Sequence, residues 1–213
     1  VAAKLANIAR HGATLWRCPP TIADREATCA QVQADTGATL VHPYADPAVM
    51  AGQGTATLEL LHSDGPFDVL VVPVGGGGLA CGTALALQHA SPHTRLVLAE
   101  PAGADDTARS LAAGTRQGPF TPDTFCDGLR TLVGVPNFAL LQAAGAEVIV
   151  VDDAATLAAM RLLWEVLKQV VEPSSATVLA AVLAQPQRFA GLRVGLVLSG
   201  GNVDLPALRW EAA

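Results

Sequence analysis

Residues 71–82 read VVPVGGGGLACG and place four consecutive glycines, Gly75 to Gly78, between an apolar run and a helix-forming segment. Glycine loses more conformational freedom on folding than any other residue, so an ordered run of four implies backbone that other atoms approach closely. The preceding residues, DVLVVPV (68–74), predict a strand buried on both faces, and LACGTALALQHA (79–90) predicts a helix. The loop N–H groups and the helix dipole together favour an anion such as phosphate. A tight turn without a ligand, which needs only one or two glycines, is the alternative.

The composition describes a globular protein without a polyanion-binding surface. Of the 213 residues, 51% are hydrophobic and 15% are charged, which is sufficient for a substantial core. The formal net charge is −6 and there are two lysines, Lys4 and Lys168, so we expect no nucleic acid partner. The four cysteines show no C-x-x-C spacing, which indicates neither a zinc site nor a disulfide framework. A reducing cytoplasm is the location that this pattern favours.

No membrane segment is expected either. Residues 69–94 contain no Asp, Glu, Lys or Arg, but the four glycines, Pro73 and Pro92 argue against a continuous apolar helix. The first twelve residues, VAAKLANIARHG, lack the uninterrupted apolar core of a signal peptide because two basic residues interrupt it.

Apolar runs alternate with helical patterns along the chain, which predicts a parallel sheet covered by helices. Besides 68–74, the expected strands are ATLWRC (13–18), TLVHP (39–43), RLVLAE (95–100), EVIVVD (147–152) and RVGLVLS (193–199). The other expected helices lie within 21–37, 51–63, 153–170 and 175–185. Ligands of such sheets bind beyond the carboxyl ends of the strands, where GGGG, EP and SGGN follow three of these runs. The PYADP turn is the one plausible domain boundary.

Two common nucleotide motifs match poorly. A dinucleotide fingerprint would use Gly75, Gly77 and the acidic Glu100, but the position three after Gly77 is Ala80 instead of glycine. A Walker loop requires G-K-[ST], which is absent from the sequence. Nucleotide binding is therefore the minor alternative for the phosphate loop.

Six motifs together resemble a known family. They are HPYADPAVMAGQGTATLEL (42–60), VVPVGGGGLACG (71–82), LAEPAGADD (98–106), DGL (127–129), VVEPSSA (170–176) and VLSGGNVDL (197–205). Their order and spacing are similar to those of pyridoxal-phosphate enzymes of the serine/threonine dehydratase and serine racemase group. The resemblance implies the tryptophan synthase β-like fold (fold type II), in which a small and a large α/β domain enclose the cofactor. It makes residues 1–45 the end of the small domain and 46–213 most of the large one.

The resemblance also implies which residues hold pyridoxal 5'-phosphate. The phosphate-binding residues would be Gly75, Gly76, Gly77, Gly78 and Leu79. Ser199 would hydrogen-bond the pyridine nitrogen, and Gly128 and Glu172 would lie beside the ring. A neutral hydroxyl leaves that nitrogen largely unprotonated, which suits α,β-elimination. Taken alone, Ser199 is an ordinary strand-end turn residue and Glu172 an ordinary helix-end carboxylate.

A second constellation, Glu100, Ala104 and Asp106, offers two carboxylates and a carbonyl, an all-oxygen set suited to Mg²⁺, Mn²⁺ or Ca²⁺. The family carries a divalent metal at matching positions. The alternative is that Asp105 or Asp106 caps the helix that follows.

For the substrate, the resemblance assigns Arg25, which would reach the carboxylate when the domains close, and Thr131 on the opposite wall. It implies a homodimer that converts L-serine, L-threonine or a 3-hydroxyaspartate to a 2-oxo acid and ammonia. Racemisation of serine or hydroxyaspartate shares the removal of the α-proton and remains open. A non-catalytic phosphate- or nucleotide-binding remnant is the third possibility.

The family's cofactor forms a Schiff base with a lysine in an S-F-K-x-R-G-A type segment, followed by an S-x-G-N-H loop, and neither motif is present in the 213 residues. Lys4 and Lys168 match other positions, so no catalytic residue is assigned. We expect a chain that lacks the first segment of its family, in agreement with the absent initiator methionine, and that is inactive alone.

Overall fold

The computed structural model describes residues 2–19, 21–205 and 208. It divides into two compact units, residues 1–42 and 43–213. The division falls at the PYADP turn, three residues before the expected boundary. That the two units are a small and a large domain of the family remains a prediction.

The first unit contains two helices, α1 (Ala2–Arg10) and α2 (Ile22–Thr36). Thr21 caps α2 by accepting a hydrogen bond from the Asp24 N–H, and Gly37 ends it in the left-handed conformation. The strands expected at 13–18 and 39–43 are wrong, because neither range is a strand. Among its described residues this unit has no strand, so these runs have no neighbour with which to form a ladder.

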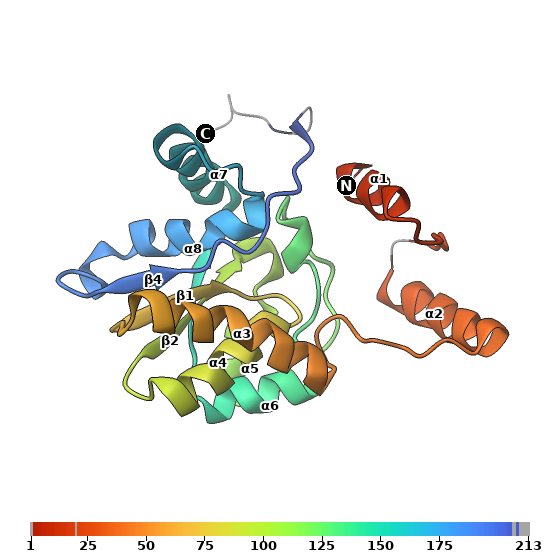
Figure 1. The fold of residues 1–213 in the computed structure, drawn as a ribbon, viewed down its shortest axis with the longest axis horizontal. Helices are drawn as coiled ribbons and strands as arrows, with labels where there is room; N and C mark the ends of the chain where they lie inside the picture. Colours follow the sequence, from red (N-terminus) through yellow and green to blue (C-terminus); the bar gives the residue numbers. More distant parts are fainter. Residues whose placement is uncertain (1, 20, 206–207, 209–213) are drawn as a thin grey trace. The chain divides into compact units, whose positions relative to one another are not determined.

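The second unit is built on a four-stranded parallel sheet in the order β3-β2-β1-β4 (Figure 1). Its strands are β1 (Val69–Pro73), β2 (Arg95–Pro101), β3 (Glu147–Val151) and β4 (Val194–Leu196). The chain moves from β1 outward through β2 to β3 and then returns to the other side of β1. The strand order therefore reverses between β1 and β4, and in open parallel sheets that crevice is where ligands bind.

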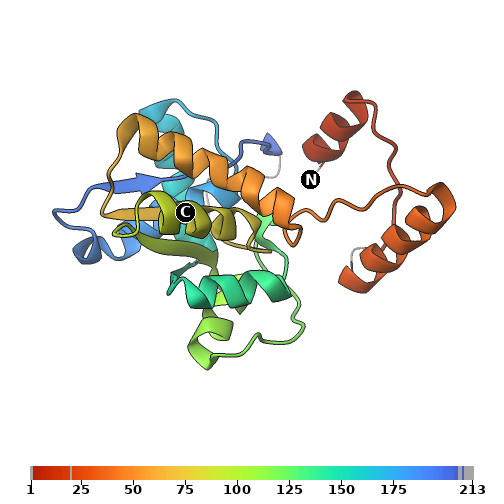
Figure 2. The same ribbon diagram turned by 60° about the horizontal axis from the view of Figure 1, so that its bottom comes forward.

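Helices cover both faces of this sheet. They are α3 (Pro47–Asp64), α4 (Gly78–Ala90), α5 (Asp106–Ala113), α6 (Val135–Ala143), α7 (Asp153–Leu162) and α8 (Pro173–Ala184). Short turns are η1 (Ala102–Ala104), η2 (Asp127–Leu129), η3 (Leu163–Leu167) and η4 (Pro186–Arg188). Helices α3 and α4 lie side by side, which Figure 2 shows in orange and olive.

The expected helix over 153–170 is shorter than its pattern suggested. The α-helix ends at Leu162 and continues as one π-helical turn to Leu167. Lys168 then takes a left-handed conformation with φ 59°, which reverses the chain toward the α8 segment. The indole N–H of Trp164 donates to the Val171 carbonyl at 3.0 Å and holds this reversal together.

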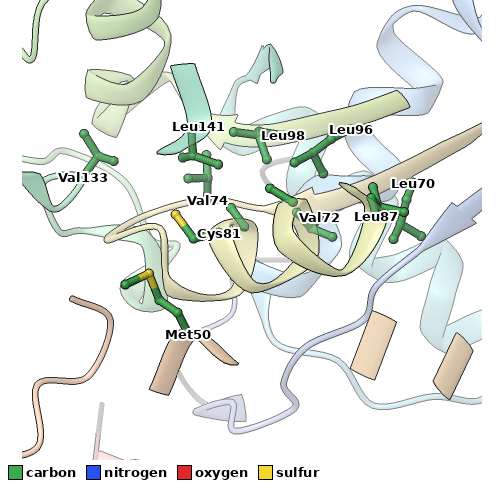
Figure 3. Close-up of a cluster of buried hydrophobic side chains, with 12 residues drawn as sticks. Met50, Leu70, Val72, Val74, Cys81, Leu87, Leu96, Leu98, Val133 and Leu141 are labelled. Carbon is green, nitrogen blue, oxygen red and sulfur yellow. The ribbon is translucent and has the colours of Figure 1, made fainter. Parts of the chain in front are cut away.

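Two apolar clusters pack against the two faces of the sheet. On one face, Leu70, Val72 and Leu98 meet residues of α3, α4 and α6 (Figure 3). On the other face, Val71 and Ile149 meet α7 and α8. All of these strand side chains are at most 1% exposed, so both faces of β1 are buried, as the apolar run predicted.

A search of the described residues finds no helix with the length and apolar character needed to cross a membrane.

Candidate functional site

The glycine run forms the turn from β1 into α4. Gly77 is the residue before the helix, with φ 93°, a conformation that side chains disfavour. No side chain caps this helix end. The first N–H groups of α4 therefore lie at the carboxyl edge of the sheet, where they favour an anion.

Protein atoms account for part of the glycine requirement. A Cβ at Gly76 would lie 2.4 Å from the Tyr44 ring, and one at Gly75 would lie 2.9 Å from the Leu129 Cα. At Gly78 the nearest backbone atom would be the Tyr44 Cα at 3.0 Å. The close approach inferred from the sequence thus includes the protein itself.

Asn137 and Gly134, which the sequence analysis did not single out, support this loop. The Asn137 side-chain amide donates to the Tyr44 carbonyl at 2.8 Å, and the Gly134 N–H donates to the Gly76 carbonyl at 3.0 Å. A Cβ at Gly77 would lie 3.0 Å from the Asn137 Cβ. Tyr44 stands inside the quoted HPYADP motif, but nothing in the sequence pattern indicates Asn137.

The loop around η2 lies beside the glycines. The Gly128 N–H donates to the Ser174 hydroxyl at 3.0 Å, and a Cβ at Gly128 would lie 3.2 Å from a carboxylate oxygen of Glu172. The hydroxyl of Thr131 lies 3.3 Å from the Cβ position of Gly75. The η2 loop therefore joins the glycine run to the start of α8.

The turn after β4 completes the cluster. The Glu172 N–H donates to the Gly200 carbonyl at 3.0 Å, and a carboxylate oxygen of Glu172 accepts from the Asn202 N–H at 3.2 Å. Ser199 is exposed, and its hydroxyl lies 3.3 Å from that of Ser175. This turn is thus fastened to the first residues of α8 while the Ser199 side chain remains accessible.

The structure brings the predicted cofactor residues together at the crevice where the strand order reverses. Gly75 to Leu79 follow β1, Ser199 follows β4, and Gly128, Glu172 and Thr131 connect the two. A helix N-terminus without a side-chain cap, at the same edge of the sheet as an exposed hydroxyl, fits a ligand with a phosphate at one end and a ring nitrogen at the other. Arg25 is exposed on α2 of the first unit.

The second constellation lies at the end of β2. Both Glu100 carboxylate oxygens accept hydrogen bonds from the first turn of α5, from the Thr107 N–H at 2.9 Å and the Ala108 N–H at 2.8 Å. The Asp105 side chain, one of the two alternative caps, makes no capping hydrogen bond, and Glu100 caps the helix instead. One Asp106 oxygen accepts from the Val133 N–H at 2.8 Å, and the other is buried without a partner.

Burial dominates the electrostatics of these carboxyl groups. Glu100 and Asp106 are both 0% exposed. Desolvation raises the pKa of Glu100 to about 8, and hydrogen bonds from the start of α5 oppose that rise only partly. Desolvation also raises the pKa of Asp106. A buried oxygen of the desolvated Asp106 carboxyl group that has no partner is an atom that a cation would stabilise.

The predicted ligands are two carboxylates and the carbonyl of Ala104, which is the buried residue of the turn η1 between them. Across the part of the chain that the structure describes, no group of three His, Cys, Asp or Glu side chains is arranged to hold a metal. A cation here would therefore rely on backbone oxygen and water for its remaining ligands.

A surface depression of about 450 Å³ lies at the opposite edge of the sheet, where β2 and β3 begin, and is lined in part by Arg95 and Glu147. Its most buried hydroxyl, Thr94, already donates to the Phe67 carbonyl at 2.6 Å. No unpartnered buried side chain faces this depression, so it offers little to a specific ligand.

Comparisons with known proteins agree with the geometry. The sequence model of the family described as pyridoxal-phosphate dependent enzyme matches residues 1–200. The β-hydroxyaspartate dehydratase of Paracoccus denitrificans is 43% identical over 209 residues, which cover 98% of this chain and 66% of that protein. The serine racemase of Dictyostelium discoideum is 42% identical over 209 residues, covering 96% of this chain and 64% of the relative.

Among solved structures, maize serine racemase superposes with a TM-score of 0.92 and 40% identity, covering 99% of this chain and 66% of that chain. The chain thus spans about two thirds of the length of the curated relatives it matches, 66% and 64% for the two named above. The predicted fold class, a parallel sheet flanked by helices of the tryptophan synthase β-like type, is confirmed. The chain belongs to the family of pyridoxal-phosphate-dependent enzymes.

Proposed function

We propose that residues 43–213 hold pyridoxal 5'-phosphate at the crevice between β1 and β4. The phosphate would bind the N–H groups of Gly75 to Leu79 at the start of α4, and the ring nitrogen would accept a hydrogen bond from Ser199. The observation that carries this proposal is the hydrogen-bonded connection of the glycine loop, the start of α8 and the SGGN turn at one edge of the sheet.

The proposed reaction is that of an ammonia-lyase acting on L-serine, L-threonine or a related 3-hydroxy amino acid, and it belongs to the whole protein. A bound pyridoxal phosphate withdraws electrons from the substrate, so that the α-proton and then the β-hydroxyl can leave. The neutral hydroxyl of Ser199 would donate to the ring nitrogen and leave it unprotonated, which favours elimination. A relative named β-hydroxyaspartate dehydratase supports this reading.

Racemisation is the second candidate, because two of the similar proteins are named serine racemase. Both reactions begin with loss of the α-proton, and they differ in whether a proton is returned to the opposite face or the β-hydroxyl is lost. Thr131, beside the glycine loop, and Arg25 are proposed to contact the substrate. A homodimer and a cytoplasmic location also remain predictions.

A titration with three ligands tests the cofactor site. Pyridoxal phosphate, NAD and ATP are each added to the 213-residue chain while the fluorescence of its tryptophans is followed. We expect saturable binding of pyridoxal phosphate and weaker or no binding of the two nucleotides. Binding of NAD alone would show that the loop is a nucleotide site. The reaction is then measured in a protein that joins this chain to the family's lysine segment. Release of 2-oxo acid and ammonia from L-serine indicates elimination, and formation of D-serine indicates racemisation.

We further propose that Glu100, Ala104 and Asp106 hold a divalent cation such as Mg²⁺ or Mn²⁺. The unpartnered oxygen of Asp106 supports the proposal, because a buried carboxylate oxygen without a donor is costly unless a cation or water faces it. The short turn η1 joins the end of β2, which carries Glu100, to the start of α5, which carries Asp106.

Thermal unfolding with and without Mg²⁺ tests this cation site. A ligand that binds only the folded state stabilises it by about 2.7 kcal/mol at 100 times its Kd, so the melting temperature should rise with added cation. Asp106→Asn should remove that rise and change little in chelator. Asp105→Asn is the matched control, since that side chain pairs with Arg109 at 2.7 Å and is not assigned to the cation. A melting temperature that ignores both cation and chelator in the unmodified chain would refute the site.

A further inference from the structure

We propose that Ser175 is a positioning residue, which fixes the turn after β4 and thereby the place of the Ser199 hydroxyl that would donate to the ring nitrogen of the cofactor. The inference rests on the proposed cofactor site. Ser175 lies in the first turn of α8, is 0% exposed, and was not indicated by the sequence analysis.

The Ser175 hydroxyl makes three contacts with the SGGN turn. It accepts a hydrogen bond from the Gly200 N–H at 2.6 Å, donates to the Gly200 carbonyl at 2.8 Å, and lies 3.3 Å from the Ser199 hydroxyl. The Glu172 N–H donates to the same Gly200 carbonyl at 3.0 Å. One buried side chain therefore holds both backbone polar groups of the residue that follows Ser199.

The protons of this cluster can be assigned by counting. A serine hydroxyl has one proton and two acceptor lone pairs. The Ser175 proton is used in the 2.8 Å contact to Gly200, and one lone pair takes the Gly200 N–H. Only a lone pair remains for Ser199, so in this pair Ser199 is the donor and Ser175 the acceptor.

This arrangement prepares Ser199 for an acceptor. An exposed serine would otherwise sample several rotamers, whereas the contact with Ser175 favours the one in which its proton is held at the cluster. The contact is long at 3.3 Å, so an unprotonated ring nitrogen could replace Ser175 as the acceptor at little cost. Ser175 would thus keep Ser199 in place and leave its proton available.

Paired ligands separate this role from a purely structural one. Affinities of the 213-residue chain are measured for pyridoxal phosphate and for its analogue with C–H in place of the ring nitrogen. The ratio of the two Kd values reports the contact to that nitrogen, and a neutral hydrogen bond makes it on the order of fivefold. Ser199→Ala should bring the ratio to about one, and Ser175→Ala should lower it to about twofold or less. The double variant should have the same ratio as Ser199→Ala alone.

Thr177→Val is the matched control. Thr177 is also 0% exposed on α8, but its hydroxyl donates only to the Ser174 carbonyl of the same helix, at 2.8 Å. This variant should keep the ratio even if it lowers the melting temperature. Ser175→Cys, which nearly preserves volume but weakens the hydrogen bonds, should behave like Ser175→Ala and serves if the latter does not fold.

The outcomes distinguish the positioning role of Ser175 from the proposed cofactor binding on which it rests. A Ser175→Ala protein with an unchanged ratio would overturn the positioning role, whatever its melting temperature. Equal binding of the two ligands by the unmodified chain would overturn the inference and leave cofactor binding standing. No binding of either ligand would overturn both.

Discussion

Replacement of Gly77 by aspartate is expected to weaken pyridoxal phosphate binding by about 100-fold or more, with the fold retained. Gly77 is the residue before α4, so the carboxylate of an aspartate there would lie beside the first N–H groups of the helix. It would occupy the phosphate's donors and add a like charge next to a dianion. Loss of two charge-assisted hydrogen bonds of about 1.5 kcal/mol each accounts for that factor.

The fold should survive, because one side chain at φ 93° costs about 1–3 kcal/mol and its Cβ would meet a side-chain atom, the Asn137 Cβ at 3.0 Å, instead of backbone. Gly145→Asp is the matched control. Gly145 also has a positive φ, 63°, nothing lies within 4 Å of its Cβ position, and it precedes β3 at the opposite edge of the sheet. Calorimetric titration of both variants with pyridoxal phosphate checks the prediction. Unchanged affinity in the Gly77 variant would mean that the glycines serve only the turn and its packing.

The features that were best predicted from sequence are those with a strong local pattern, such as a buried apolar strand, and those with a backbone conformation that only glycine adopts readily. The run before Gly75 is apolar and β-branched, and both faces of β1 are indeed buried. The strand, loop and helix order around the glycines is the predicted one, while the phosphate site at the carboxyl edge of the sheet stays a prediction. Gly77 has a positive φ, a backbone conformation that other residues disfavour, so at this position the backbone itself requires glycine.

Features that depend on contacts distant in sequence were not predictable. Ser175 accepts a hydrogen bond from the Gly200 N–H, and Asn137 donates one to the carbonyl of Tyr44, 93 positions away in the chain. Glu100 caps α5 from the preceding strand, although the nearer Asp105 had the expected position for a cap. Each of these residues is polar and common, so its local sequence carries no signal of its partner.

The false strands in the first unit have a different cause. ATLWRC and TLVHP have the apolar, β-branched composition of strands, and composition describes what a residue prefers when a neighbouring strand is available. In the first unit no described residue belongs to a strand, so these segments have no neighbouring strand to pair with. Propensity thus identifies strands reliably only where the periodic pattern also implies their neighbours.

The last expectation concerns the two lysines. Incubation of the 213-residue chain with pyridoxal phosphate, followed by borohydride, should leave Lys4 and Lys168 without a specific adduct. Lys168 is exposed after the π-helical turn, and its ammonium donates to the Glu165 carbonyl. Lys4 is on α1 in the first unit. Neither belongs to the motif in which the family carries its reactive lysine, so the chain should release no 2-oxo acid from serine or threonine.

Absorption spectra and mass spectrometry of peptides after reduction measure both parts of this expectation. The intact β-hydroxyaspartate dehydratase relative, treated in parallel, is the positive control for trapping, and Lys168→Arg removes the amine of one candidate while keeping its charge. Saturable phosphate-dependent binding without an adduct would separate binding of the cofactor from the covalent step. A stable adduct on Lys168 that disappears in Lys168→Arg, together with keto acid released from serine, would contradict the expectation. The left-handed backbone at φ 59° would then be part of a catalytic arrangement different from that of the family.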